Sequence, residues 1–177
     1  GLADACTNLG VTFQNDKDLA AAAPYFERAF TVYAELARDY PSSPRYVDSL
    51  NSARTNLATI LAADPDTRER GAALLRDAVA SQTELVGRFP QSIEYRTLLA
   101  MMVGNLGTLE SGGGDVARGI ELLSQALDRH GELLREQPGN PVLQARSVVF
   151  GLKLANLHLQ GGDSRAAADV LATTEAL

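Results

Sequence analysis

The stretch "CTNLGVTF", residues 6–13, decides the fold, because its asparagine–leucine pair recurs three times further along the chain. The later asparagines are Asn56, Asn105 and Asn156, which gives intervals from Asn8 onward of 48, 49 and 51 residues. The prolines that follow helical runs keep almost the same interval: Pro41, Pro90 and Pro138. Two independent markers with one spacing indicate a repeated structural unit.

The composition favours helices as the content of that unit. Hydrophobic residues make up 45% of the 177 residues, only 6% are aromatic, and there is no tryptophan. Most of the apolar residues are Leu, Ala and Val, which suits many helices packed through small side chains better than one large core. We therefore predict an all-α protein.

Each repeat contains two helical patterns, one before and one after the region of its asparagine. The unit is therefore a helix pair, and the prolines mark the turns between pairs. The predicted units are residues 1–41, 42–90, 91–138 and 139–177, of which the first and last are partial. We expect a single solenoid fragment cut from a longer array, with its last helix ending at Leu177.

The second unit shows how the helix ends are predicted. Ser42 or Ser43 is expected to cap a helix that has Pro44 in its first turn, where a missing N–H costs nothing. That helix should run to about Ala63, and its partner should start at residues 64–66, where aspartates can cap it.

The first unit resembles the tetratricopeptide repeat. Leu9-Gly10, Phe13, Ala22, Phe26 and Ala29 are similar to its signature, and Cys6 stands where that family usually has tryptophan. The resemblance implies an α-solenoid of antiparallel helix pairs in which Leu9, Gly10 and Phe13 form the helix crossing. Units of about 48–51 residues, instead of the usual ~34, predict helices of about 21 residues.

The longer units resemble the repeat regions of large planctomycete-type bacterial proteins, in which the repeats often follow a Ser/Thr protein kinase domain. This resemblance is carried by "RFPQSIEYRTLLAMMVGNLG", residues 88–107. It implies an alternative role as an intramolecular regulatory or dimerisation arm of a kinase whose catalytic domain lies outside this chain.

Charge excludes one class of partner. The net charge is −6 and no cluster of Lys or Arg occurs, so we expect no nucleic-acid binding. There is no apolar run of 18 residues, and we expect no membrane contact by this chain. The single cysteine is compatible with a reducing compartment, which favours a cytoplasmic location, with an extracytoplasmic one as the alternative.

No catalytic residue, cofactor site or metal site is predicted, and we expect no enzyme. The sequence lacks the glycine-rich loop, His-Arg-Asp and Asp-Phe-Gly motifs of a kinase. The cluster "GGGD", residues 112–115, lacks the Lys and Ser/Thr of a phosphate loop, so Asp115 is expected to cap the next helix, as is Asp163.

The two histidines and the cysteine are also interpreted as structural. His130 and His158 have too few potential co-ligands for a metal site. We expect His130 to be a solvated surface residue and His158 to fill a small-residue position at a helix crossing. Cys6 has no basic neighbour in the sequence to activate it as a nucleophile, and it is expected to pack in the place of the usual tryptophan.

The resemblance places the repeated asparagines in the concave groove of the solenoid. It implies that Asn8, Asn56, Asn105 and Asn156 face a ligand, since a primary amide can pair with both the N–H and the C=O of a peptide backbone. Their predicted neighbours are small and neutral, without Lys or Arg, which suits an extended neutral peptide or a helix better than an acidic tail. These proposed peptide-binding neighbours are Thr7, Val11, Thr55, Thr59 and Thr108, with Gly104, Ala155 and Leu159 beside them.

The predicted function is a non-catalytic scaffold for protein–protein interaction that binds a peptide or a partner helix in this groove. The alternative interpretation of the asparagines is structural, as tolerated residues that bond the neighbouring repeat or water. Exposed ends of the repeat array could in addition join copies of the chain into a homo-oligomer.

Overall fold

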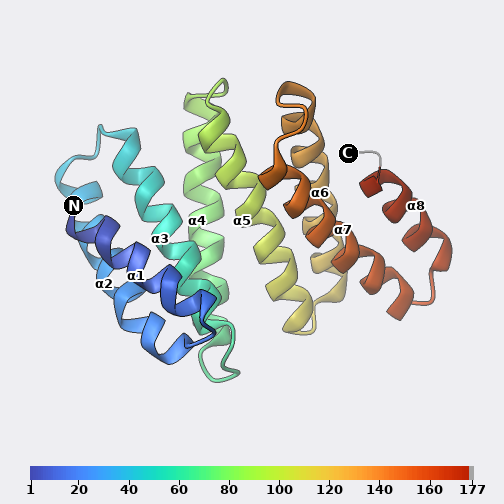
Figure 1. Ribbon diagram of the computed structural model, residues 1–177, viewed down its shortest axis with the longest axis horizontal. Coiled ribbons are helices and arrows are strands. Elements are labelled where there is room, and N and C mark those ends of the chain that lie inside the picture. The colour runs from blue at the N-terminus through green and yellow to red at the C-terminus, as the bar shows by residue number, and fades with distance from the viewer. Residues whose placement is uncertain (176–177) are drawn as a thin grey trace. The chain divides into compact units, whose positions relative to one another are not determined.

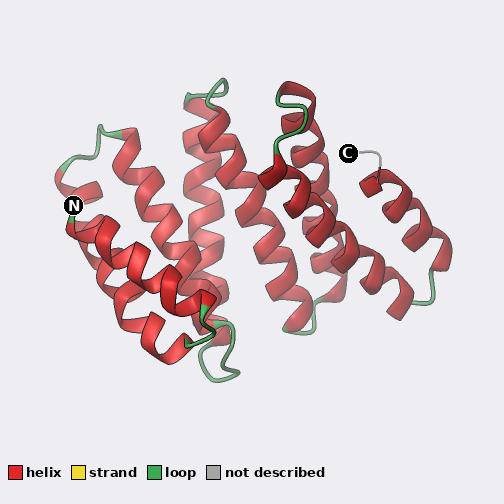
Figure 2. Ribbon diagram, viewed as in Figure 1, coloured by secondary structure: helices red, strands yellow, loops and turns green. Residues whose placement is uncertain are grey.

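The computed structural model describes residues 1–175 and consists, over that range, of eight α-helices joined by short loops (Figures 1 and 2). The chain divides into two compact units, of which unit 1 is Gly1–Phe89 and unit 2 starts at Pro90. The helices of unit 1 are α1 (Leu2–Asn15), α2 (Leu19–Asp39), α3 (Pro44–Leu61) and α4 (Arg68–Arg88). Those of unit 2 are α5 (Ile93–Gly112), α6 (Val116–Glu136), α7 (Pro141–Gln160) and α8 (Ser164–Glu175). The prediction of an all-α fold of helix pairs is confirmed.

Each unit contains two helix pairs. Within unit 1, α1 packs on α2 and α3 on α4, and α2 joins the two pairs by packing on α3. Unit 2 repeats the plan with α5 on α6, α7 on α8, and α6 on α7. The second helices α2, α4 and α6 are each 21 residues long, as the repeat length predicts. The predicted end of the last helix at Leu177 lies outside the described residues.

In three of the four pairs, the same kind of tight turn joins the first helix to the second. Its second residue has a positive φ, and its third is an aspartate whose carboxylate accepts a hydrogen bond from an N–H in the first turn of the next helix. The aspartate N–H also donates to a carbonyl five residues back, at 2.9–3.0 Å. These turns are residues 16–18, 113–115 and 161–163, and the predicted capping by Asp115 and Asp163 is confirmed.

The turn between α3 and α4 is different and corrects the predicted helix ends. Helix α3 stops at Leu61 instead of Ala63, and α4 starts at Arg68 instead of residues 64–66. The carboxylate of Asp64 accepts a hydrogen bond from the N–H of Asp66 within the loop, so it stabilises the loop instead of a helix. The Thr67 hydroxyl donates to the Leu61 carbonyl at 2.7 Å and so closes the end of α3.

Pro44 occupies the first turn of α3, as predicted, and Ser43 is its N-cap residue, although its side chain makes no capping hydrogen bond. In unit 2, Asn140 caps α7 by accepting from the N–H groups of Val142 and Leu143.

The core of the first helix pair is built around a close approach of α1 to α2. A Cβ atom on Gly10 would lie 2.7 Å from the Phe26 ring, so only glycine allows this contact. Cys6 is buried, as expected for a packing residue, and Phe13 stacks on Tyr25 with ring centroids 5.5 Å apart. Leu9 is 46% exposed, so the expectation that it packs at the helix crossing is wrong.

Candidate peptide-binding faces

The four repeated asparagines each lie on the first helix of a pair. Asn8 on α1 and Asn156 on α7 are exposed, whereas Asn56 on α3 and Asn105 on α5 are half-buried. Within residues 1–175, no hydrogen bond of any of these four side-chain amides to another residue is found. Each unit thus holds two amides with unused donors and acceptors, separated by one repeat.

Two other asparagines show what a structural role looks like in this chain. The Asn51 amide is fully buried and donates to Ser81 Oγ at 3.1 Å and to Gln82 Oε1 at 3.0 Å. Asn140 is used entirely in local bonds, since it caps α7 and donates to Gln137 Oε1. The repeated asparagines differ from both because their amides have no such internal partners.

The threonines near the asparagines donate their hydroxyl protons to backbone carbonyls of their own helix. Thr7, Thr59 and Thr108 donate to the carbonyls of Ala3, Thr55 and Gly104 at 2.9–3.0 Å, which leaves an oxygen lone pair available at each surface. Val11 is 38% exposed on α1, and Leu159 is exposed on α7.

Some predicted neighbours do not reach the surface. Thr55 is 2% exposed and donates to the Asn51 carbonyl, so it cannot contact a ligand. Gly104 and Ala155 are also buried. A Cβ atom on Gly104 would lie 2.5 Å from the Phe150 ring, which shows that this position serves the contact between α5 and α7.

A lysine lies on the predicted neutral wall of unit 2. Lys153 Nζ on α7 donates to Thr108 Oγ1 on α5 at 3.2 Å. Lys153 lies three residues before Asn156, and Thr108 lies three residues after Asn105. The predicted neighbours in unit 2 are themselves neutral, but one of them, Thr108, is contacted by this lysine. Partial burial lowers the pKa of Lys153.

The structure also shows a buried polar position that the sequence analysis missed. Tyr33, Gln82 and His130 lie 49 and 48 residues apart, at one repeat position on α2, α4 and α6, and all three are buried. Tyr33 donates to Asp4 Oδ1 at 2.6 Å, and Gln82 Nε2 donates to Asp48 Oδ1 at 2.8 Å. This position could have been found in the sequence, because a polar residue recurs there at the repeat interval on the apolar face of each second helix.

His130 is the exception among the three, and it corrects the prediction of a solvated residue. Its ring is 0% exposed and lies 5.6 Å from the Phe150 ring, centroid to centroid. Nδ1 lies 2.7 Å from the Ala126 carbonyl and must carry the proton, while Nε2 has no hydrogen-bond partner among the described residues. Burial, assisted by the charge of Arg146, lowers the pKa of His130, although the bond to Ala126 opposes this.

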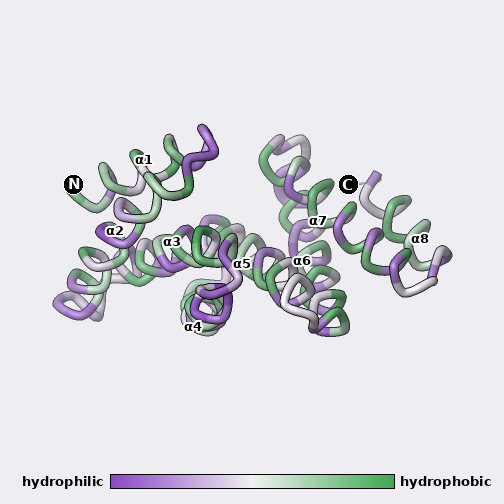
Figure 3. Tube along the Cα trace, turned by 90° about the horizontal axis from the view of Figure 1, so that it is seen from below, coloured by the Kyte–Doolittle hydropathy of each residue, from purple (hydrophilic) through white to green (hydrophobic). Residues whose placement is uncertain are grey.

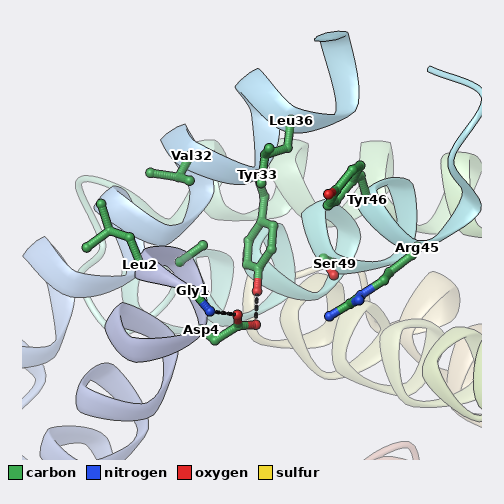
Figure 4. A pocket seen from close by; sticks show the side chains of 10 residues that line it. Gly1, Leu2, Asp4, Val32, Tyr33, Leu36, Arg45, Tyr46 and Ser49 are labelled. Carbon is green, nitrogen blue, oxygen red and sulfur yellow. Dashed lines mark hydrogen bonds and ion pairs between the residues drawn. The ribbon is translucent and has the colours of Figure 1, made fainter. Parts of the chain in front are cut away.

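A pocket of about 210 Å³ lies within unit 1 between α1, α2 and α3 (Figure 4). At its floor, Asp4 accepts hydrogen bonds from the Gly1 amine and from the Tyr33 hydroxyl, and the Arg45 side chain extends toward them. Burial and the Asp4 carboxylate raise the pKa of Tyr33 to about 12. Asp4 and Tyr33 therefore satisfy each other, and the pocket floor is an internal contact between helices.

The described residues contain no group of three His, Cys, Asp or Glu side chains placed to hold a metal ion. None of the helices in residues 1–175 is both long enough and apolar enough to cross a lipid bilayer.

Comparison with solved structures supports the fold. The chain is similar over 98% of its length to the crystal structure of BtubC (BKLC) from P. vanneervenii, with 19% sequence identity and a TM-score of 0.72. It is also similar over 97% of its length to the apo form of RapI, with 15% identity and a TM-score of 0.68. The chain spans 62% and 54% of those two proteins, respectively.

Comparison at the level of sequence is more limited. No curated protein matches the chain. Residues 2–37, which comprise α1 and most of α2, match the family model described as a tetratricopeptide repeat. This match is confined to the first helix pair, and the solved structures share the helix-pair fold over nearly the whole chain.

Proposed function

We propose that the chain is a protein-interaction module that binds extended peptide segments through the repeated asparagines on α1, α3, α5 and α7. A primary amide has two N–H donors and a carbonyl acceptor, so it can pair with the N–H and C=O groups of a peptide backbone whatever the peptide sequence. Because the amides recur once per helix pair, each unit offers two such contacts to the same ligand.

The observation that carries the proposal is that these four side chains have no hydrogen-bond partner among the described residues. A structural role would require such a partner, as Asn51 shows with its bonds to Ser81 and Gln82 on the other helix of its pair. Amides that are exposed or half-buried and unpaired are instead available to a ligand or to water.

The experiment compares asparagine variants against peptides selected from a random display library on the wild-type chain. For a selected peptide, Asn56→Ala combined with Asn105→Ala should weaken binding by about 1 kcal/mol per site, or about fivefold each. Helicity and melting temperature should stay close to wild type, because no internal bond is lost.

The matched control is Asn15→Ala, which removes an exposed asparagine at the end of α1, outside the repeated positions. It should leave peptide affinity unchanged. A double variant that loses several kcal/mol of stability and no affinity would show that the asparagines are structural and would refute the proposal.

A further inference from the structure

Helix α7 carries an unusual row of exposed apolar side chains. Their exposed fractions are 46–58%, and we call the set the α7 stripe: Val142, Val148, Val149, Leu152 and Leu159. Figure 3 shows hydrophobic residues alternating with hydrophilic ones along this helix. Apolar side chains scattered singly over a surface need no explanation, but a set on one helix does.

The stripe lies on one side of the helix. At 3.6 residues per turn, its five members fall within an arc of about 120°, and Asn156 lies inside the same arc. From Val142 to Leu159 the stripe runs for about 25 Å along the helix axis, at 1.5 Å per residue. A straight apolar row of this length matches one face of a helix of about five turns.

The repeat plan does not require the stripe. Counted from the repeated asparagines, Val148, Val149, Leu152 and Leu159 on α7 correspond to positions on α3 exactly one hundred residues earlier. Those positions hold polar residues: Asp48, Ser49, Ser52 and Thr59. The stripe is therefore apolar where α3 is polar, although α5 also has apolar residues, Leu98 and Met101, at the positions of Val149 and Leu152.

The charged side chains of α7 are all positive. The helix contains Arg146 and Lys153 and no Asp or Glu, in a chain whose net charge is −6. Both cations lie on the edge of the exposed arc next to Val149 by helical spacing. Neither forms an ion pair within residues 1–175, whereas Arg96 and Arg118 pair with Glu136 and Glu121 at 2.6 and 2.5 Å.

The surroundings of the two cations confirm that they lack an acidic partner. Burial lowers the pKa of Arg146 and of Lys153, and no carboxylate is found to offset it in either case. A carboxylate brought to this edge would gain charge-assisted contacts that the chain itself does not supply.

We propose that the α7 stripe binds an amphipathic helix of a partner protein, with apolar residues packed on the stripe and Asp or Glu facing Arg146 and Lys153. The inference rests on the proposed interaction function, because it assigns a partner to one of the same first helices. It does not require the asparagines to contribute to this contact.

The test uses a designed 20-residue helical peptide with leucines spaced three and four apart and glutamates along one flank. A matched peptide carries lysines in place of the glutamates. Fluorescence anisotropy should show that the acidic peptide binds at least tenfold more tightly than the basic one, and that salt reduces the difference.

Two variants locate the contact. Val149→Ser combined with Leu152→Ser should weaken binding of the acidic peptide at least tenfold. The control, Leu19→Ser combined with Leu171→Ser, removes exposed apolar residues outside the stripe and should leave this binding unchanged. Lys153→Glu should reduce or reverse the preference for the acidic peptide. Circular dichroism checks that each variant is folded.

Several outcomes would overturn the inference: equal binding of the two peptides, or full binding by the stripe variant. Sedimentation showing self-association that the stripe variant abolishes would identify a second copy of the chain as the occupant and would also overturn it.

The asparagine variants separate this inference from the proposed function. If library-selected peptides depend on the asparagines but the acidic helix does not bind, only the inference fails. If the acidic helix binds through the stripe while the asparagine variants bind every selected peptide as tightly as wild type, the proposed asparagine function fails and the inference stands.

Discussion

Units 1 and 2 place a polar side chain at the same repeat position but surround it differently. In unit 1, Gln82 on α4 donates to Asp48 and accepts from Asn51, so both ends of its amide are bonded. In unit 2, His130 on α6 bonds only the Ala126 carbonyl, and its Nε2 is buried without a partner among the described residues. The repeat spacing therefore determines where a side chain lies, whereas its neighbours determine whether it is satisfied.

The difference between the two residues can be tested by replacing each of them, in separate variants, with leucine. Gln82→Leu should destabilise the protein by about 2–3 kcal/mol, because the Asp48 carboxylate and the Asn51 amide each lose a buried partner. His130→Leu should change stability by less than about 1 kcal/mol, because it removes an unsatisfied nitrogen along with one hydrogen bond.

Urea denaturation followed by circular dichroism measures both changes, with Gln144→Leu as an exposed control. Equal losses for the two leucine variants would mean that His130 has a stabilising partner after all.

The second prediction concerns the pH dependence of stability. His130 in unit 2 can titrate, whereas Gln82, its counterpart in unit 1, cannot. Because the pKa of His130 is below its ordinary value of 6.5 in the folded state, the unfolded chain binds the proton first as pH falls. Stability contributed by this site is fully present above about pH 6.5 and is lost as pH drops toward the folded-state pKa. The slope is at most about 1.4 kcal/mol per pH unit for one proton.

Melting temperatures measured between pH 8 and pH 5 test this expectation. His130→Gln should flatten the dependence. A wild-type slope that survives in His130→Gln would assign the dependence to other groups.

The smallest effect is expected at the tight turns, where the residue at the positive-φ position differs between the units. The positive-φ position is glycine in unit 2, at Gly114 and Gly162, but Lys17 in unit 1, with a φ of 63°. Lys17→Gly should stabilise the protein by about 0.5–1 kcal/mol by relieving the left-handed conformation of a side-chain-bearing residue. Thermal unfolding measures the change, and Lys17→Ala, which keeps a Cβ atom, should give no comparable gain.

Much of the fold could be predicted because its signals are local or periodic. The asparagine and proline spacings indicated the helix pairs, and Asp115 and Asp163 indicated helix starts because each follows glycines and can accept from an N–H in the first turn of a helix. The start of α4 was predicted wrongly because Asp64 can serve a loop turn equally well, and the sequence does not distinguish the two uses.

The side-chain environment was harder to predict because it depends on neighbouring helices. The helical pattern of α6 alone does not reveal that the His130 ring lies against the Phe150 ring of α7. The long side chain of Lys153 crosses from α7 to Thr108 on α5, a contact that backbone spacing cannot indicate. The apolar residues of the α7 stripe, in contrast, could have been found from the sequence, because helical spacing places them on a different face of α7 from its buried apolar residues.

The buried Cys6 gives unit 1 a built-in reporter of its own motion. It is the only thiol in the chain, and it belongs to the same core cluster as Ala29 and Tyr33 of α2 and Leu50 of α3. A thiol reagent can modify it only when α1 separates from these helices, so the labelling rate in native buffer measures the free energy of that local opening. The wild-type chain can thus report, without any engineered probe, how often its first helix leaves the repeat.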